Sequence, residues 1–505
     1  MPAVGAALLA VCLAATADAG PRRDQAYYHY LLSRQALTDR DLPTALREMD
    51  AARQADPASA DLAVELARLH MEVGDPVKAA EAAREATELE PLSSEAPRLL
   101  AEALFTLAMR DEATPADVDV AVAALKDLQA RAPGDAEVPL DLARLLASRG
   151  RFEEALAPAN THLEKNPGSE EGALLASQVL VKLGRFQQAQ DLLLESIRVN
   201  PKRTRLRMGL MECYEAEGRF EDASTVATRL IEGGVEVPRI RYALARVRQK
   251  MGDYGGAYEQ LAALSGWMDE HAAQIPPGER KEIELRKVGL LLEAGRLPDA
   301  ATAAEQMALQ HPDEERFTTA RAEALILQGK QDEAARMFTP PGPEADARLS
   351  RAYLSAGARR QRQDDTRRAE QFLRTAIDLD PGNADALNHL GYMLADQGRR
   401  LNEAVDLVER ALRKEPDNGA YLDSLGWAHY KKKEYRRSRE ILERARDAMP
   451  DEPEIHEHLG ELYFSMGRVD EAIASWEKAL QLGTPRAEQV RNRLSEARKG
   501  AKSGE

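Results

Sequence analysis

Glycine, alanine and proline recur along this chain at a fixed spacing, between runs of helix-forming residues. The glycines stand 34 residues apart at Gly150, Gly184, Gly218 and Gly252. An alanine follows each of them five residues later, and prolines recur at the same spacing at Pro167 and Pro201. Glycine accepts the left-handed conformation that ends a helix, alanine lets the next helix approach closely, and proline ends that second helix. The pattern therefore predicts a repeated helix–turn–helix unit.

The same frame continues in both directions and is clearest near the C-terminus. There it gives the pairs Leu390-Gly391, Leu425-Gly426 and Leu459-Gly460, with Ala411, Ala445 and Ala479 on the second helices. With this period and these small and apolar positions, the sequence resembles the tetratricopeptide repeat (TPR) family. The resemblance implies an all-α fold: a right-handed TPR α-solenoid of about thirteen helix-turn-helix repeats between residues 26 and 482. It also implies a protein that binds other proteins.

Several repeats are irregular, and the breaks predict a division of the array. Residues 265–280 add an insertion that contains Pro276-Pro277-Gly278, and Pro340-Pro341-Gly342-Pro343 forbids a normal second helix. A charged insertion follows at residues 359–368. We therefore expect an N-terminal TPR array at 26–264, an irregular insertion at 265–280, middle units at 281–343 and a C-terminal array at 345–482. Residues 483–505 are expected to form a charged capping helix and tail.

The N-terminus predicts export. Residues 3–17 form an uncharged apolar run, and Ala17-Asp18-Ala19 follows as a cleavage pattern, so residues 1–19 read as a signal peptide. No Lys or Arg precedes the run, and the alternative is an uncleaved apolar helix. Leu9-Ala10-Val11-Cys12 partly resembles a lipobox, so membrane association is expected only if Cys12 is lipidated. The expected location is periplasmic or associated with the outer membrane.

Composition and motifs narrow the chemistry. The net charge is −16 and charges of both signs are mixed along the chain, which argues against a nucleic-acid partner. The sequence contains no zinc-protease motif, phosphate-binding glycine loop or serine-hydrolase motif. His456 and His458 are two residues apart, so on a helix they point in nearly opposite directions and cannot share a metal ion. We therefore expect no enzyme activity, no cofactor and no metal.

The family resemblance also implies which residues line the concave groove, because the first helix of each TPR unit faces it. In the last three units these positions hold Asn388, Tyr392, Asp423, Trp427, Tyr430, Glu457, Glu461 and Phe464. Earlier units place Arg68, Arg144, Arg205, Arg239 and Arg246 on the same side. Aromatic rings suit peptide binding, and arginines suit carboxylates. The alternatives are ordinary helix packing for the rings and solvated surface charge for the arginines.

Residues 387–476 resemble a group of exported bacterial TPR adaptors more closely. The stretches ALNHLGYMLADQGRRLNEAVDLVERAL, YLDSLGWAHY and EIHEHLGELYFSMGR carry the resemblance. The group includes an outer-membrane lipoprotein that activates a carboxyl-terminal processing protease. This implies a non-enzymatic scaffold or adaptor of the cell envelope, with such a protease as a partner. A scaffold for polysaccharide secretion or envelope assembly, and a cytoplasmic regulatory TPR protein, are the alternatives.

Overall fold

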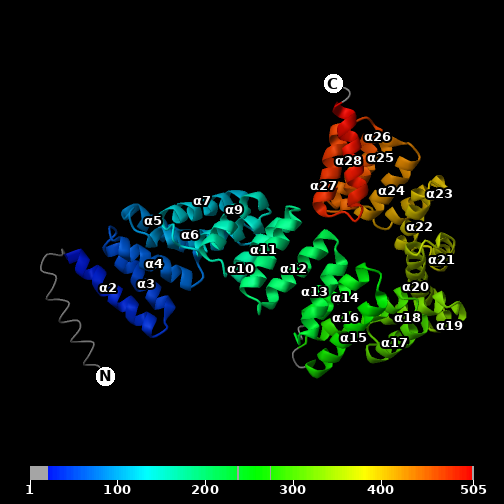
Figure 1. Cartoon of the computed structure of the whole chain (residues 1–505), viewed down its shortest axis with the longest axis horizontal. Helices are drawn as coiled ribbons and strands as arrows, with labels where there is room; N and C mark the ends of the chain where they lie inside the picture. The colour runs from blue at the N-terminus through cyan, green and yellow to red at the C-terminus, as the bar shows by residue number, and fades with distance from the viewer. Residues whose placement is uncertain (1–20, 236–237, 273–274, 503–505) are drawn as a thin grey trace. The chain divides into compact units, whose positions relative to one another are not determined.

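A computed structural model describes residues 21–235, 238–272 and 275–502. These residues form 27 α-helices and no β-strand (Figure 1). Twenty-four of these helices pair in chain order as twelve helical hairpins, α2 with α3 through α12 with α13 and α16 with α17 through α26 with α27. Helices α14 and α15 stand on either side of the boundary between two units, and α28 follows the last hairpin. The predicted all-α fold is confirmed, and the 27 described helices agree with about thirteen two-helix repeats. The chain divides into two compact units between Met251 and Gly252, and each is described by itself.

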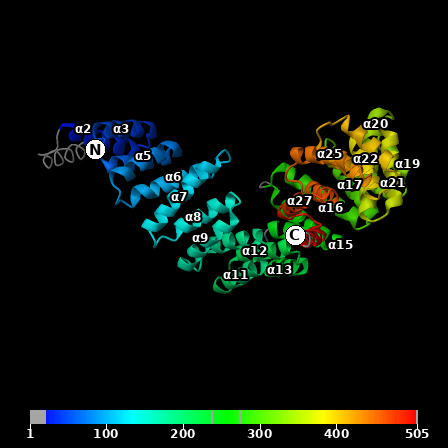
Figure 2. The same ribbon diagram turned by 90° about the horizontal axis from the view of Figure 1, so that it is seen from above.

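The first unit contains thirteen of the described helices. Their bounds are α2 Pro21–Thr38, α3 Leu42–Ala55, α4 Ala60–Glu72, α5 Pro76–Leu89, α6 Glu95–Ala108, α7 Pro115–Arg131, α8 Glu137–Ser148, α9 Phe152–Lys165, α10 Glu170–Lys182, α11 Phe186–Val199, α12 Thr204–Glu217, α13 Phe220–Glu232 and α14 Pro238–Lys250. Figure 2 shows the hairpins of this unit following one another in chain order.

The second unit contains the other fourteen described helices. Their bounds are α15 Tyr254–Glu270, α16 Pro277–Glu293, α17 Leu297–Gln310, α18 Glu315–Leu327, α19 Gln331–Arg336, α20 Pro343–Arg362, α21 Thr366–Leu379, α22 Ala384–Asp396, α23 Leu401–Leu412, α24 Gly419–Lys431, α25 Tyr435–Ala448, α26 Pro453–Ser465, α27 Val469–Leu482 and α28 Ala487–Lys502.

Local signals in the sequence set the hairpin turns. Gly150 and Gly184 adopt φ of 72° and 71°, the left-handed conformation that glycine accepts without strain. Side chains then cap the following helices: Asp75, for example, accepts a hydrogen bond from the backbone N–H of Lys78 at the start of α5. Each turn therefore stops one helix and starts the next within a few residues.

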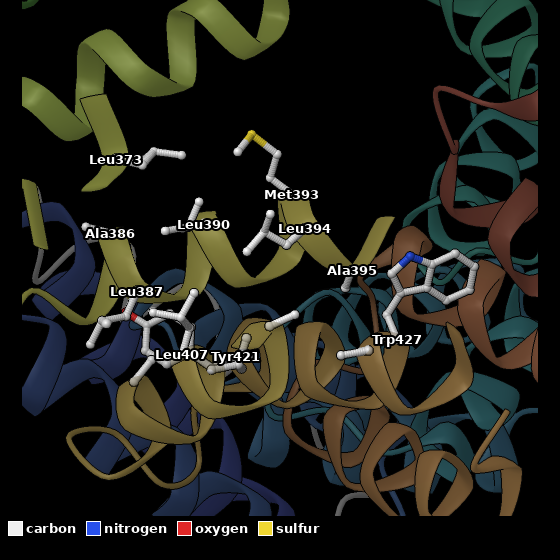
Figure 3. Close-up of a cluster of buried hydrophobic side chains, with 14 of the residues drawn as sticks. Leu373, Ala386, Leu387, Leu390, Met393, Leu394, Ala395, Leu407, Tyr421 and Trp427 are labelled. Carbon is white, nitrogen blue, oxygen red and sulfur yellow. The ribbon is translucent and has the colours of Figure 1, made fainter. Parts of the chain in front are cut away.

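Close helix approach holds each hairpin together. Ala155 and Ala189 on second helices are completely buried. At Gly391 of α22 an added Cβ would lie 2.5 Å from Val408 of α23, so only glycine permits this spacing. Figure 3 shows the resulting core, in which leucines of α22 meet Leu407 of α23 and Tyr421 of α24. Stacking the hairpins buries a continuous apolar layer that no single hairpin could bury.

The first helices of successive hairpins lie against one another. Helix α22 contacts α24, and α24 contacts α26, whereas second helices of neighbouring hairpins touch far less. The first helices, which carry even numbers, therefore form the inner layer of each unit. We call them the inner helices.

The irregular segments adopt particular shapes. Helix α19 has only six residues and stops before the proline-rich turn, and α20 then runs for 20 residues. The segment 265–280 contains the end of α15 and the start of α16, and residues 359–362 complete α20. The predicted division into three arrays stays a prediction. The predicted signal peptide and Cys12 lie outside the described residues, and none of the described helices is both long and apolar enough to cross a membrane.

Candidate protein-binding site

The predicted C-terminal site residues lie on three inner helices. Asn388 and Tyr392 belong to α22, Asp423 and Trp427 to α24, and Glu461 to α26; Tyr430 and Phe464 lie further along α24 and α26. Trp427 and Asp423 are buried, with 8% and 6% of their surface exposed. Asn388, Tyr392, Tyr430 and Glu461 are half-buried. Two of the residues predicted to face the groove from α24, Asp423 and Trp427, are therefore also packing residues.

Four rings from the three inner helices stack into a column. Trp427 lies parallel to Tyr430 at 4.7 Å and to His458 at 4.1 Å between ring centroids. Tyr392 lies 6.3 Å from His458 between ring centroids, with the two ring planes tilted by 39°. We call Tyr392, His458, Trp427 and Tyr430 the aromatic column. Sequence reasoning placed three of its members on the groove side and missed His458.

His458 is fixed by an ion pair with Asp423. Its Nδ1 lies 2.9 and 3.0 Å from the two carboxylate oxygens of Asp423, and both side chains are buried. Burial acts to lower the pKa of His458, but the carboxylates of Asp423 and Glu454 outweigh it, so that pKa is raised. The partners are 35 residues apart on successive inner helices, and nothing local in the sequence indicates their contact. His456 instead contacts the backbone carbonyl of Pro450, so the two histidines do point apart.

Two cavities open beside the aromatic column. One of about 520 Å³ is lined by Trp427, Tyr430 and His458 and by Gln489 and Asn492 of α28. Glu461 borders it as well. Burial raises the pKa of Glu461 although Arg493, 3.2 Å away, lowers it. Helix α28 therefore continues the inner surface and does more than cap the last hairpin.

The second cavity, of about 220 Å³, lies between α22, α24 and α26. Asn388, Tyr392 and Asp423 line it, together with Glu452 and Glu454. The side-chain oxygen of Asn388 is buried and has no hydrogen-bond partner among the described residues. An unpaired buried acceptor at a cavity wall is suited to receive an N–H group from a bound chain.

Phe464 does not join these residues. Its ring packs against Trp476 of α27 at 5.7 Å, within its own hairpin, and it lines neither cavity. The structure thus brings seven of the eight predicted C-terminal residues together around two cavities, with Glu457 lining the larger one. Phe464 corresponds to the alternative interpretation, in which an aromatic ring serves helix packing.

Two family models with the description "Tetratricopeptide repeat" match this chain. One matches residues 64–108, 285–339 and 424–489, and the other matches 116–179, 180–235 and 360–427. Together the matches cover more than half of the chain, and they lie in the helical part described above. The chain belongs to the tetratricopeptide repeat family. TPR arrays are typically interaction scaffolds, and no enzyme family is indicated.

Known TPR proteins are similar to this chain over different lengths. A TPR repeat-containing protein of Pseudomonas aeruginosa is 33% identical over 195 residues, which is 38% of this chain and 33% of the relative's own length. Solved structures include yeast Tom70, with 14% identity, a TM-score of 0.36 and coverage of 95% of this chain and 96% of that one. Cut9 in the APC/C complex Cut9-Hcn1 has 16% identity, a TM-score of 0.31 and coverage of 94% and 96%. Similarity at this level is too low to transfer a partner.

The five arginines predicted to face the groove from repeats of the first compact unit all form ion pairs. Arg205 lies 3.7 Å from Glu170, Arg239 lies 3.2 Å from Glu212, and Arg246 lies 2.6 Å from Glu215. In each pair the glutamate belongs to the preceding inner helix, and Arg68 and Arg144 likewise pair with Glu95 and Glu171 on the following ones. The pairs form a ladder that links neighbouring repeats. Exposed pairs of this kind are weak, so they hold the arginines without burying them.

Within the described part of the chain, no three His, Cys, Asp or Glu side chains gather closely enough to hold a metal ion. The Asp423–His458 pair corresponds to two of the three members of a nucleophilic triad, but the hydroxyl of the neighbouring Ser424 donates to the carbonyl of Ala420. Rings, amides and charged groups line the two cavities.

Proposed function

We propose that this TPR protein is a non-enzymatic adaptor of the bacterial cell envelope. Its partner proteins bind along the inner helices of the C-terminal repeats, and the adaptor brings them to a processing protease of the carboxyl-terminal class. The aromatic column and the two cavities beside it are the observation that supports this location of the binding site. It combines large ring surfaces with unpaired polar groups over α22, α24, α26 and α28.

The polar groups at these cavities favour a peptide in extended form. The amides of Gln489 and Asn492 are exposed at the larger cavity, and the oxygen of Asn388 is unpaired at the smaller one. An extended peptide presents N–H and C=O groups at regular intervals, and side-chain amides can meet both. Aromatic anchors supply the contact area that such a peptide needs.

Export and the protease partner rest on the sequence. The apolar run that ends in Ala17-Asp18-Ala19 supports export, and residues 387–476 support the adaptor role through their resemblance to exported TPR adaptors. Membrane association requires lipidation of Cys12. Mass spectrometry of the chain isolated from the envelope tests both points: a free N-terminus at Gly20 supports cleavage, and a lipidated Cys12 supports anchoring.

Site-specific photo-crosslinking tests the binding surface. Benzoylphenylalanine is placed at Asn388 or Asn492 beside the cavities, and at the exposed Glu440 on the second helix α25 as the matched control. We expect a discrete crosslinked protein from each cavity position and none from Glu440. Capture of the same proteins at all three positions would contradict the assignment of the site.

A further inference from the structure

Two hydrogen-bond donors and one ring nitrogen, from three elements, lie around one carboxylate at the smaller cavity. The hydroxyl of Tyr392 on α22 donates to Oε1 of Glu454 at 2.8 Å. The guanidinium of Arg486, just before α28, donates to the same oxygen at 3.0 Å. Nε2 of His458 lies 4.0 Å from that oxygen as well. The contact between Tyr392 and Glu454 joins inner helices that are two repeats apart.

His458 remains incompletely paired in this arrangement. Only 2% of its side chain is exposed, and its Nε2 has no hydrogen-bond partner among the described residues. Since Nδ1 is held by Asp423, the ring cannot turn to find another partner. A buried polar atom without a partner is rare in proteins and calls for an explanation. Here the atom faces the place that the Glu454 carboxylate approaches but does not fill.

Glu454 is more exposed and less tightly packed than Tyr392 and His458 beside it. Its side chain is 45% exposed and lies in the first turn of α26, at the edge of the smaller cavity. It contributes no apolar surface to the core, so its carboxylate can turn toward solvent while the backbone stays in place. Tyr392 and His458, by contrast, are held in the aromatic column.

We infer that Tyr392, His458 and Arg486 form a carboxylate-binding site that the chain's own Glu454 occupies in the free protein. A carboxylate of the bound partner displaces Glu454 and takes the same three donors. This inference rests on the proposed function, because it specifies the chemistry of the peptide bound in the C-terminal groove. The partner is an acidic peptide, whose carboxylate comes from a side chain or from its C-terminus.

The displaced glutamate acts as an internal competitor. Apparent affinity falls by the fraction of molecules in which the site is open, so removal of Glu454 raises affinity by the inverse of that fraction. The donors themselves keep their places, since Arg486 also lies 2.7 Å from Glu457 and His458 stays paired with Asp423. Substitution of Glu454 is therefore expected to strengthen binding, whereas substitution of a donor weakens it.

Fluorescence anisotropy with three defined peptides and the full chain tests the inference. All three carry fluorescein at the N-terminus: one has internal glutamates and an amidated end, one is an Ala/Ser peptide with a free C-terminus, and one is the same Ala/Ser peptide amidated. For Glu454→Ala we expect at least about fivefold tighter binding of a carboxylate-bearing peptide, as follows if the site is open in at most about a fifth of the molecules. Adding Tyr392→Phe should remove most of this gain.

Glu452→Ala is the matched control. Glu452 borders the same cavity two residues earlier, and its side chain makes no hydrogen bond or ion pair with the described residues, so its removal changes the charge equally without freeing the donors. Glu454→Gln, which keeps the shape of the side chain, serves as a second variant and should give a smaller gain. Circular dichroism of each variant establishes that the repeats remain folded.

Each result either supports or overturns the proposed carboxylate-binding site. A gain for the glutamate peptide or for the free C-terminus supports the site and identifies the source of the carboxylate. An equal gain in Glu452→Ala, an equal gain for the amidated Ala/Ser peptide, or no binding of any peptide to Glu454→Ala overturns the inference. Those outcomes would not contradict the proposed function, because the crosslinking experiment tests it without depending on Glu454.

Discussion

A buried ion-pair cluster joins three consecutive inner helices of the second unit, and its central arginine offers a sharp test. Nε of Arg359 on α20 lies 2.7 Å from Glu323 on α18, and its NH1 lies 2.5 Å from Glu293 at the end of α16. Arg359 and Glu323 are both more than nine-tenths buried. Arg359→Met removes the cation, leaves similar apolar volume, and strands the Glu323 carboxylate in the core.

The expected cost follows from the burial. Breaking a buried pair by removing one partner costs about 3–5 kcal/mol, because the remaining charge is desolvated without compensation. Arg362 on the same helix provides the control: it lies 3.0 Å from Glu293 but is 57% exposed. An exposed pair contributes at most about 1 kcal/mol, so Arg362→Met should be nearly neutral. The difference between the two variants should exceed about 2 kcal/mol.

The pH dependence of the Arg359→Met defect identifies its cause. Burial raises the pKa of Glu323 against the opposing effect of Arg359, and loss of the arginine should raise it further. A carboxyl with a raised folded pKa favours the fold when protonated, so its contribution is present at low pH and is lost as the pH rises through that pKa. The gap between Arg359→Met and wild type should therefore be widest near neutral pH and shrink on acidification.

Urea unfolding by circular dichroism measures the total effect, and hydrogen exchange in α18 and α20 locates it. The exchange data matter because a repeat array with two units need not unfold in one step. Arg359→Met combined with Glu323→Leu should recover most of the loss, since an apolar replacement of both partners is often neutral. Equal losses in Arg359→Met and Arg362→Met, or no recovery in the double variant, would refute the reasoning.

Two further predictions concern helices of the second unit. Gly391→Ala should cost about 1–3 kcal/mol by overpacking, because the new Cβ would lie 3.0 Å from the backbone oxygen of Ala404, which cannot move aside. Gly289→Ala, with open space around its Cβ, should instead stabilise by about 0.5–1 kcal/mol, and thermal melts of the two variants would show opposite shifts. The raised pKa of His458 means that its protonated form, paired with Asp423, stabilises the fold, and Asp423→Asn should abolish this stabilisation. That stabilisation is present below pH 6.5 and is lost as the pH rises through the raised value, so wild type and variant should converge at high pH in urea titrations.

The repeat architecture could be predicted because its signals are local. A left-handed glycine such as Gly150, a fully buried alanine such as Ala155 and a proline near the next unit all lie within one period. Each of these residues acts through its own backbone conformation or size, so no knowledge of distant neighbours is needed. The short helix α19 agrees with the prolines that follow it for the same reason.

The candidate site depends on contacts between repeats, and the sequence predicts these contacts less well than it predicts the repeats themselves. The repeat position placed Asn388 and Tyr392 on the inner side, but it could not show that His458 meets Asp423 of the previous repeat. Arg359 opens a segment that reads as a charged insertion, and yet it is buried, because glutamates one and two repeats earlier supply its partners. A repeat pattern indicates which way a side chain points within its own repeat. How deeply that side chain is buried, and which residue it pairs with, depend on the neighbouring repeats.

The same reasoning decides which substitutions can report on binding. Trp427 is 8% exposed, stacks on His458 and donates its indole N–H to Asp396 at 3.2 Å, so it joins two repeats as well as lining a cavity. Truncating a buried tryptophan costs about 3–5 kcal/mol, so Trp427→Ala would loosen the repeats and lose binding for either reason. Glu454 and Asn492 lie at the cavity mouths and hold little core together, so a change in binding there reports recognition itself. The gain expected from Glu454→Ala is the more informative, because a loosened array does not bind more tightly.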